Sequence, residues 1–158
     1  MPHIASRDTA LIVTDRSAQL ADAAISLAEE HRILTLIGEP DGSARDGKGG
    51  HQRIFVKHGG NAFFGTEVAL LLRSARTRFV LLVGCSVGEM VLDAADAMTR
   101  GYEAAILVEP EQVADAGSLI AALFAGRQER PSVLTLEELK QAWNGVPQET
   151  RNWHGCSW

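Results

Sequence analysis

Three groups of polar side chains stand directly after short apolar runs. Asp15 follows the run ALIV at residues 10–13, Lys57 ends the run RIFVK, and Cys85–Met90 follow the run FVLLV. If these runs are parallel strands, their carboxyl ends meet at one edge of a sheet, which is where such proteins bind ligands. A carboxylate and an ammonium that converge there beside a helix N-terminus make an acid/base site. Taken singly, each residue is more typical of a turn, a cap or a solvated charge than of a functional site.

The elements that position these residues alternate along the chain. Apolar runs at 10–13, 33–37, 53–57, 78–83, 103–108 and 132–136 predict strands, and amphipathic segments at 17–31, 66–75, 88–100, 111–125 and about 137–143 predict helices. Ser17 is expected to cap the first helix. This alternation predicts an α/β fold, a three-layer α/β/α sandwich around a mostly parallel, Rossmann-like sheet of five or six strands. One domain spans residues 1–145, and residues 146–158 form a tail.

Composition excludes several classes of function. The 158 residues carry 15 basic and 20 acidic side chains, a net charge of −5, with no basic stripe for nucleic acid to bind. No apolar run approaches the ~20 residues of a membrane-spanning helix, and the first ten residues lack the pattern of a signal peptide. We therefore expect a cytoplasmic protein that binds neither nucleic acid nor membrane. Its two cysteines, Cys85 and Cys156, are expected to be free thiols.

Three segments together resemble the isochorismatase-like cysteine hydrolases, which include nicotinamidases, N-carbamoylsarcosine amidases and isochorismatases. They are ALIVTD at 10–15, RIFVKHGGNAFFGTEVALLL at 53–72, and RFVLLVGCSVGEMVLDAADAMTRGYEAAILVE at 78–109. SVLTLEEL at 132–139 is similar to the closing strand and helix of that family. The resemblance implies that Asp15 is the general acid or base and Lys57 the catalytic lysine. It also implies that Phe63 belongs to a segment that shapes the pocket.

The resemblance fails at the nucleophile. One residue is missing between Gly84 and Asp96 relative to the family, so either Glu89 or Met90 occupies the position of the catalytic cysteine. Helical phase places Val91, Ala95 and Met98 on the buried face and Glu89, Asp93 and Asp96 on another. Either residue 89 or 90 is then expected to face the pocket from the first helical turn. A carboxylate gains from the field of a helix N-terminus as a thiolate does, whereas methionine forms no thioester.

Cys85 and Ser86 resemble the GCS opening of the amidase relatives, where this cysteine precedes the nucleophile. Both are expected to line the substrate site, and the spacing argues against Cys85 as a substitute nucleophile. No metal is expected, because His51 and His58 lack ligand spacing. No cofactor is expected either, because the chain has no phosphate-binding glycine motif.

Three functions remain open. The chain is a degenerate member of the family that binds a small molecule or serves as a non-catalytic subunit, or it is an active, cysteine-independent hydrolase that uses Asp15 and Lys57 on a small anionic or amide substrate. The third possibility is a structural protein whose role is oligomer assembly. We expect the chain to form a homo-oligomer or to be a subunit of a larger assembly. Because a fold does not fix a function, the sequence alone does not decide between them.

Overall fold

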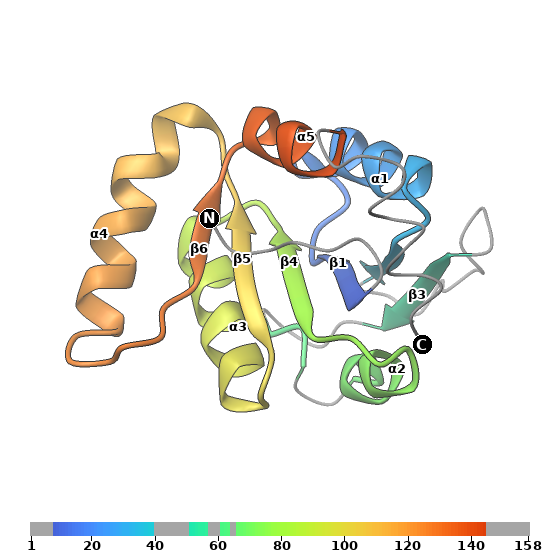
Figure 1. The fold of residues 1–158 in the computed structure, drawn as a ribbon, viewed down its shortest axis with the longest axis horizontal. Helices are drawn as coiled ribbons and strands as arrows, with labels where there is room; N and C mark the ends of the chain where they lie inside the picture. The colour runs from blue at the N-terminus through green and yellow to red at the C-terminus, as the bar shows by residue number, and fades with distance from the viewer. Residues whose placement is uncertain (1–7, 40–50, 57–60, 64–65, 145–158) are drawn as a thin grey trace.

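The computed structural model describes residues 8–39, 51–56, 61–63 and 66–144 (Figure 1). Lys57, His58, Cys156 and the predicted tail lie outside the described residues. In chain order the elements are β1 (Thr9–Val13), α1 (Ala21–Glu30), β2 (Leu34–Glu39), β3 (Gln52–Val56), α2 (Val68–Ser74), β4 (Phe79–Val83), α3 (Val87–Thr99), β5 (Glu103–Leu107), the short 3-10 helix η2 (Pro110–Gln112), α4 (Val113–Leu123), β6 (Ser132–Leu134) and α5 (Leu136–Asn144).

The six strands form one sheet in the order β3-β2-β1-β4-β5-β6, and every neighbouring pair is parallel. The predicted α/β fold with a parallel sheet is thereby confirmed. The chain winds outward from β1 to β3, returns to the centre, and winds the other way from β4 to β6. The direction therefore reverses between β1 and β4, and in such sheets the crevice beyond the strand ends at this reversal is the usual ligand site.

Helices cover both faces of the sheet because side chains alternate along each buried strand. Ile12 and Leu82 contribute to a core under α2, α3 and α4, whereas Leu11 and Leu81 face the opposite core under α1 and α5. Figure 1 shows α1 and α5 together on one face and α3 on the other. All five residues of β1 and of β4 are buried, so the centre of the sheet is a rigid base for the loops that follow these strands.

The first helix differs from its prediction. It begins at Ala21, its N-cap is Leu20, and no side chain caps it, so Ser17 does not act as the predicted cap. The residues between Val13 and Ala21 form turns instead, which leaves the Ser17 hydroxyl available to other partners. No helix among the described residues is long and apolar enough to cross a membrane.

Candidate functional site

Asp15 and Cys85 meet at the point where the sheet reverses direction. Asp15 follows β1, Cys85 follows β4, and these strands are hydrogen-bonded neighbours paired through Val13 and Val83. The Cys85 thiol donates to Asp15 Oδ2 with a sulfur–oxygen distance of 3.1 Å. Cys85 is exposed and Asp15 partly so, which makes the pair accessible to a ligand. The two strand ends thus bring Asp15 and Cys85 together, a direct contact that the sequence analysis did not predict.

The loop after β1 holds the Asp15 carboxylate in place. The backbone N–H of Ser17 donates to Asp15 Oδ1 at 2.9 Å, and the Ser17 hydroxyl donates to the same oxygen at 2.6 Å. The hydroxyl also lies 3.9 Å from the Cys85 sulfur. Short polar residues often bond to the backbone two residues on, which is the local signal for this turn. With Oδ1 held by Ser17, Oδ2 faces the thiol.

The first turn of α3 borders this pair. Ser86 is the N-cap, and its exposed hydroxyl accepts a hydrogen bond from the Glu89 N–H at 3.4 Å. The N–H groups of Val87 and Gly88 begin the helix and therefore have no carbonyl four residues earlier in the helix to bond. Because such groups and the helix dipole favour negative charge, a thiolate or an oxyanion beside this turn is stabilised. Glu89 is exposed at the third helical position, where a carboxylate also stabilises the helix.

Met90 does not lie with Asp15 and Cys85. Its side chain is 1% exposed and packs in the core under α3, and its Cγ lies 3.4 Å from where a side chain on Gly84 would begin. The structure therefore corrects the expectation that residue 90 faces the pocket. The phase of α3 differs from the prediction because Met90, Val91 and Asp93 all point inward, which leaves Glu89 as the exposed one of the two candidates.

Gly84 joins β4 to Cys85 and tolerates no side chain. A Cβ there would overlap Thr14 Oγ1, which donates to the Val83 carbonyl at 3.2 Å at the β1–β4 junction. We expect Gly84→Ala to destabilise the protein by about 1–3 kcal/mol, because a buried junction must shift to admit the methyl group. The measurement is the free energy of unfolding in urea.

Gly88→Ala is the matched control for that measurement. A Cβ at Gly88 meets only Ser86 Oγ, at 3.6 Å, and alanine is favoured over glycine in a helix, so stability should rise by about 0.5–1 kcal/mol. Equal stabilities for Gly84→Ala and the parent would contradict the packing described at the junction.

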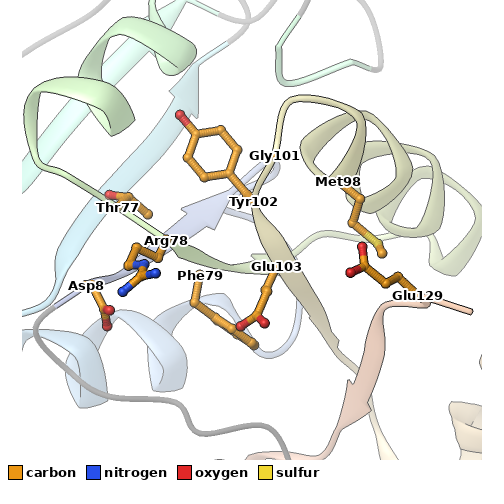
Figure 2. A pocket seen from close by; sticks show the side chains of 9 residues that line it. All are labelled: Asp8, Thr77, Arg78, Phe79, Met98, Gly101, Tyr102, Glu103 and Glu129. Carbon is orange, nitrogen blue, oxygen red and sulfur yellow. The ribbon is translucent and has the colours of Figure 1, made fainter.

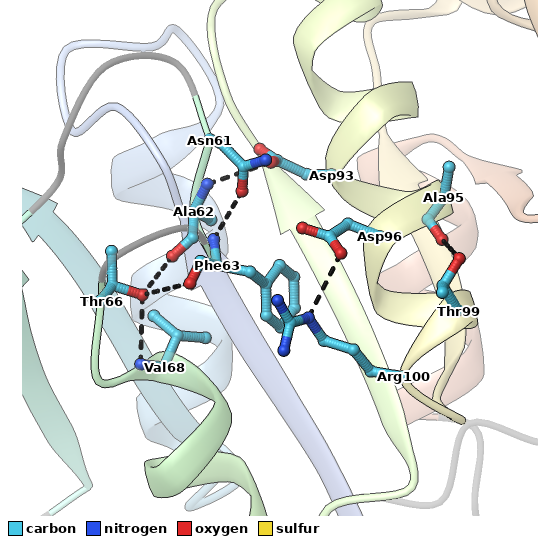
Figure 3. A network of polar contacts seen from close by, with 10 residues as sticks. All are labelled: Asn61, Ala62, Phe63, Thr66, Val68, Asp93, Ala95, Asp96, Thr99 and Arg100. Carbon is cyan, nitrogen blue, oxygen red and sulfur yellow. Dashed lines mark hydrogen bonds and ion pairs between the residues drawn. The ribbon is translucent and has the colours of Figure 1, made fainter.

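Phe63 was expected to line the substrate site, and the structure places it elsewhere. Its ring is 3% exposed and lies under the Arg100 guanidinium, 5.2 Å from the ring centroid. Arg100 follows the last turn of α3 and is paired with Asp96 at 3.2 Å (Figure 3). Phe63 is therefore a core residue near the C-terminal end of α3, whereas Cys85 precedes the first turn, at the N-terminal end of that helix.

Asp93 links α3 to residues 61–63. Its Oδ1 accepts the Ala62 N–H at 3.0 Å, and the Asn61 side chain accepts the Phe63 N–H at 2.8 Å (Figure 3). Asp93 is 1% exposed, so the prediction that it lies away from the buried face of α3 is wrong. Its carboxylate satisfies a backbone donor that would otherwise be buried without a partner. The segment that follows β3 and Lys57 in sequence is thereby attached to the helix that borders Cys85.

A separate cavity of about 510 Å³ opens at the opposite edge of the sheet (Figure 2). Asp8, Phe79 and Glu103 line it from the amino ends of β1, β4 and β5. A five-residue strand spans ~16 Å, so this cavity is too far from the Asp15–Cys85 pair to hold a substrate for it. Among the described residues, no group of three or more His, Cys, Asp or Glu side chains is arranged to hold a metal ion.

Comparison with known proteins relates this fold to one group of hydrolases. No family model and no curated protein matches the sequence. A cysteine hydrolase from Pseudomonas syringae pv. phaseolicola 1448A superposes with a TM-score of 0.67 at 14% identity over 92% of this chain and 96% of its own. The nicotinamidase of Staphylococcus aureus has a TM-score of 0.60 at 18% identity, over 80% of this chain and 98% of its own. N-carbamoylsarcosine amidase from Thermoplasma acidophilum has a TM-score of 0.58 at 17% identity, over 83% of this chain and 98% of its own. The chain thus shares its fold with the isochorismatase-like cysteine hydrolases.

Proposed function

We propose that this chain is an isochorismatase-like hydrolase that cleaves a small amide or carbamoyl compound, with Cys85 as nucleophile and Asp15 as its base. The sequence spacing argues against Cys85 as a substitute nucleophile. The observation that carries the proposal against that expectation is the 3.1 Å contact between the thiol and Asp15 Oδ2. A carboxylate this close to a thiol accepts its proton during attack, and the exposed position of the pair admits a substrate. The shared fold with nicotinamidase and N-carbamoylsarcosine amidase supports the class of reaction.

The proposed reaction has two halves. The Cys85 proton passes to Asp15 while the sulfur attacks the carbonyl carbon, and the electrons of the carbon–oxygen double bond move to the oxygen. When that double bond re-forms, the carbon–nitrogen bond breaks, and the leaving nitrogen takes the proton from Asp15. Water then attacks the thioester and gives its proton to Asp15. The carbon–sulfur bond then breaks as the carbonyl re-forms, the acid product leaves, and the thiolate regains its proton from Asp15.

Other groups would assist this reaction. The N–H groups of Val87 and Gly88 are the nearest helix N-terminal donors for an oxygen anion that forms beside Cys85. Lys57 comes next in the sequence after β3, and we propose that its ammonium stabilises the Asp15 carboxylate and the thiolate. Ser86, exposed beside Cys85, and Glu89 are proposed to contact the substrate.

Two other functions are supported by different observations. The first turn of α3 carries no thiol, because Glu89 and Met90 are the two candidates for the position of the family's cysteine, and Met90 is buried. This favours a degenerate protein that binds a small molecule or acts as a non-catalytic subunit. Glu89 is exposed and Asp15 is partly exposed, which favours a cysteine-independent hydrolase, in which Asp15 protonates a vinyl ether and Lys57 holds an anionic substrate. A role in oligomer assembly alone requires neither a nucleophile nor an acid or base.

Product release from a panel of substrates distinguishes these functions. The panel holds small primary amides, N-carbamoyl amino acids and isochorismate, and the proteins are the parent, Cys85→Ala and Lys57→Ala. We expect turnover of an amide or carbamoyl compound that falls at least ~10³-fold in Cys85→Ala, because no other group replaces the covalent step. Turnover that survives Cys85→Ala and disappears in Lys57→Ala would instead indicate the cysteine-independent hydrolase. Absence of turnover would favour binding or assembly.

A further inference from the structure

We infer that Ser17 is a positioning residue whose hydroxyl changes partner during the reaction, from Asp15 in the resting state to the Cys85 thiolate once the proton has moved. The inference rests on the proposed function, because it concerns the same thiol and the same base. It assigns a task to a side chain that neither the sequence pattern nor the shared fold identifies.

The Ser17 hydroxyl is not needed for local structure. It does not cap α1, whose N-cap is Leu20. It is also not needed to hold Asp15 Oδ1, because the backbone N–H of Ser17 already donates to that oxygen at 2.9 Å. The hydroxyl is a second donor to the same atom, at 2.6 Å, and it rotates about one bond.

The Ser17 oxygen, the Asp15 carboxylate and the Cys85 sulfur form a closed triangle, with the hydroxyl 3.9 Å from the sulfur and the sulfur 3.1 Å from Oδ2. A rotation of the hydroxyl hydrogen, together with a small movement of the side chain, exchanges one acceptor for the other. Both acceptors are thus within reach of one donor.

Before the reaction the negative charge of this pair is on Asp15, and the hydroxyl donates to it. After the proton moves from Cys85 to Asp15, the charge is on sulfur. Hydrogen bonds to charged acceptors are about twice as strong as neutral ones, so the hydroxyl is expected to follow the charge. The thiolate is then stabilised at the moment of attack, and the Ser17 N–H still orients the neutral carboxyl.

The test is the rate at which iodoacetamide alkylates Cys85, which requires no substrate. The full chain carries Cys156→Ser so that one thiol remains, and the variants are Ser17→Ala, Ser17→Thr and, as a remote exposed serine, Ser118→Ala. Arg16 and Glu89, the described charged residues nearest in sequence to this pair, stay unchanged in all of them. Mass spectrometry of the peptide that contains Cys85 gives the extent of reaction.

At neutral pH we expect Ser17→Ala to react about fivefold more slowly than its parent. The Ser17 N–H still bonds Asp15 Oδ1 in the resting state, whereas the thiolate loses the hydroxyl as its donor, so less thiolate is present. At about pH 10, where an ordinary thiol is ionised, it should react as fast or faster, because its thiolate has lost a donor. Ser17→Thr should restore the neutral rate, and Ser118→Ala should leave both rates unchanged.

Two results would overturn the inference. One is alkylation of Ser17→Ala at neutral pH as fast as in the parent or faster, which would mean that the hydroxyl only restrains Asp15. The other is an equal slowing at both pH values, which would indicate a change in access or folding. The proposed function fails separately, through turnover that is absent or does not depend on Cys85, and the alkylation rates do not depend on that outcome.

Discussion

Asp15→Asn is expected to lower turnover by about two to four orders of magnitude while the protein stays folded, since general base catalysis contributes about that much. Asparagine has the same shape, and its oxygen still accepts hydrogen bonds from Ser17 in place of Oδ1. Its NH₂ group would face the Cys85 thiol instead of Oδ2 and cannot accept the thiol proton. The variant therefore separates the chemistry of Asp15 from its place in the loop. The measurement is the steady-state rate on the substrate that the panel identifies.

Asp22→Asn is the matched control, because Asp22 is an exposed carboxylate in the first turn of α1. It should keep the turnover of the parent. Retention of more than about a third of the parent rate by Asp15→Asn would show that another group accepts the thiol proton, since loss of a positioned base is far larger than that. Circular dichroism spectra of both variants should match the parent.

Trp143→Ala is expected to have the largest effect on stability, about 3–5 kcal/mol in the free energy of unfolding. Trp143 is 1% exposed in the core shared by α1 and α5, and its ring lies 5.7 Å from that of His31. Together with Leu139, it is one of the two buried residues that attach α5 to the sheet. Loss of the ring leaves a large cavity under that helix. The measurement is a urea titration followed by circular dichroism.

Trp143→Phe tests whether the ring or its polar group matters. The indole N–H makes no hydrogen bond with the described part of the chain, so phenylalanine loses only some packing, at about 1–1.5 kcal/mol. Leu92→Ala, at a residue 60% exposed on α3, should change stability by less than about 0.5 kcal/mol. A loss in Trp143→Ala as small as in Leu92→Ala would contradict the docking of α5 described here.

Much of the fold was predictable because its central strands are continuous apolar runs. Buried parallel strands have no polar face, so β1 and β4 appear in the sequence as ALIV and FVLLV, and their ends locate Asp15 and Cys85 to within a residue or two. The reversal between these neighbouring strands was not predictable, because strand order depends on pairings between distant segments.

The errors in the candidate site have physical causes. Met90 was placed by its spacing from a family motif, yet the phase of α3 turns it into the core. Helical phase placed Asp93 away from the buried face, but Asp93 accepts the N–H of Ala62, 31 residues earlier in the chain, and no local pattern reveals such a contact. Ser17 has a residue type that suits both a helix cap and a turn, and the turn contact with Asp15 prevailed.

The most direct test of the account is detection of a covalent intermediate on Cys85. The full chain is mixed with the substrate that the panel identifies, quenched in acid within the first turnovers, digested, and analysed by mass spectrometry. We predict that the acyl group of the substrate is attached to the peptide that contains Cys85, and that Asp15→Asn accumulates far less of it. An active protein whose Cys85 peptide is never acylated, or whose turnover survives Cys85→Ala, would contradict the assignment of Cys85 as the nucleophile.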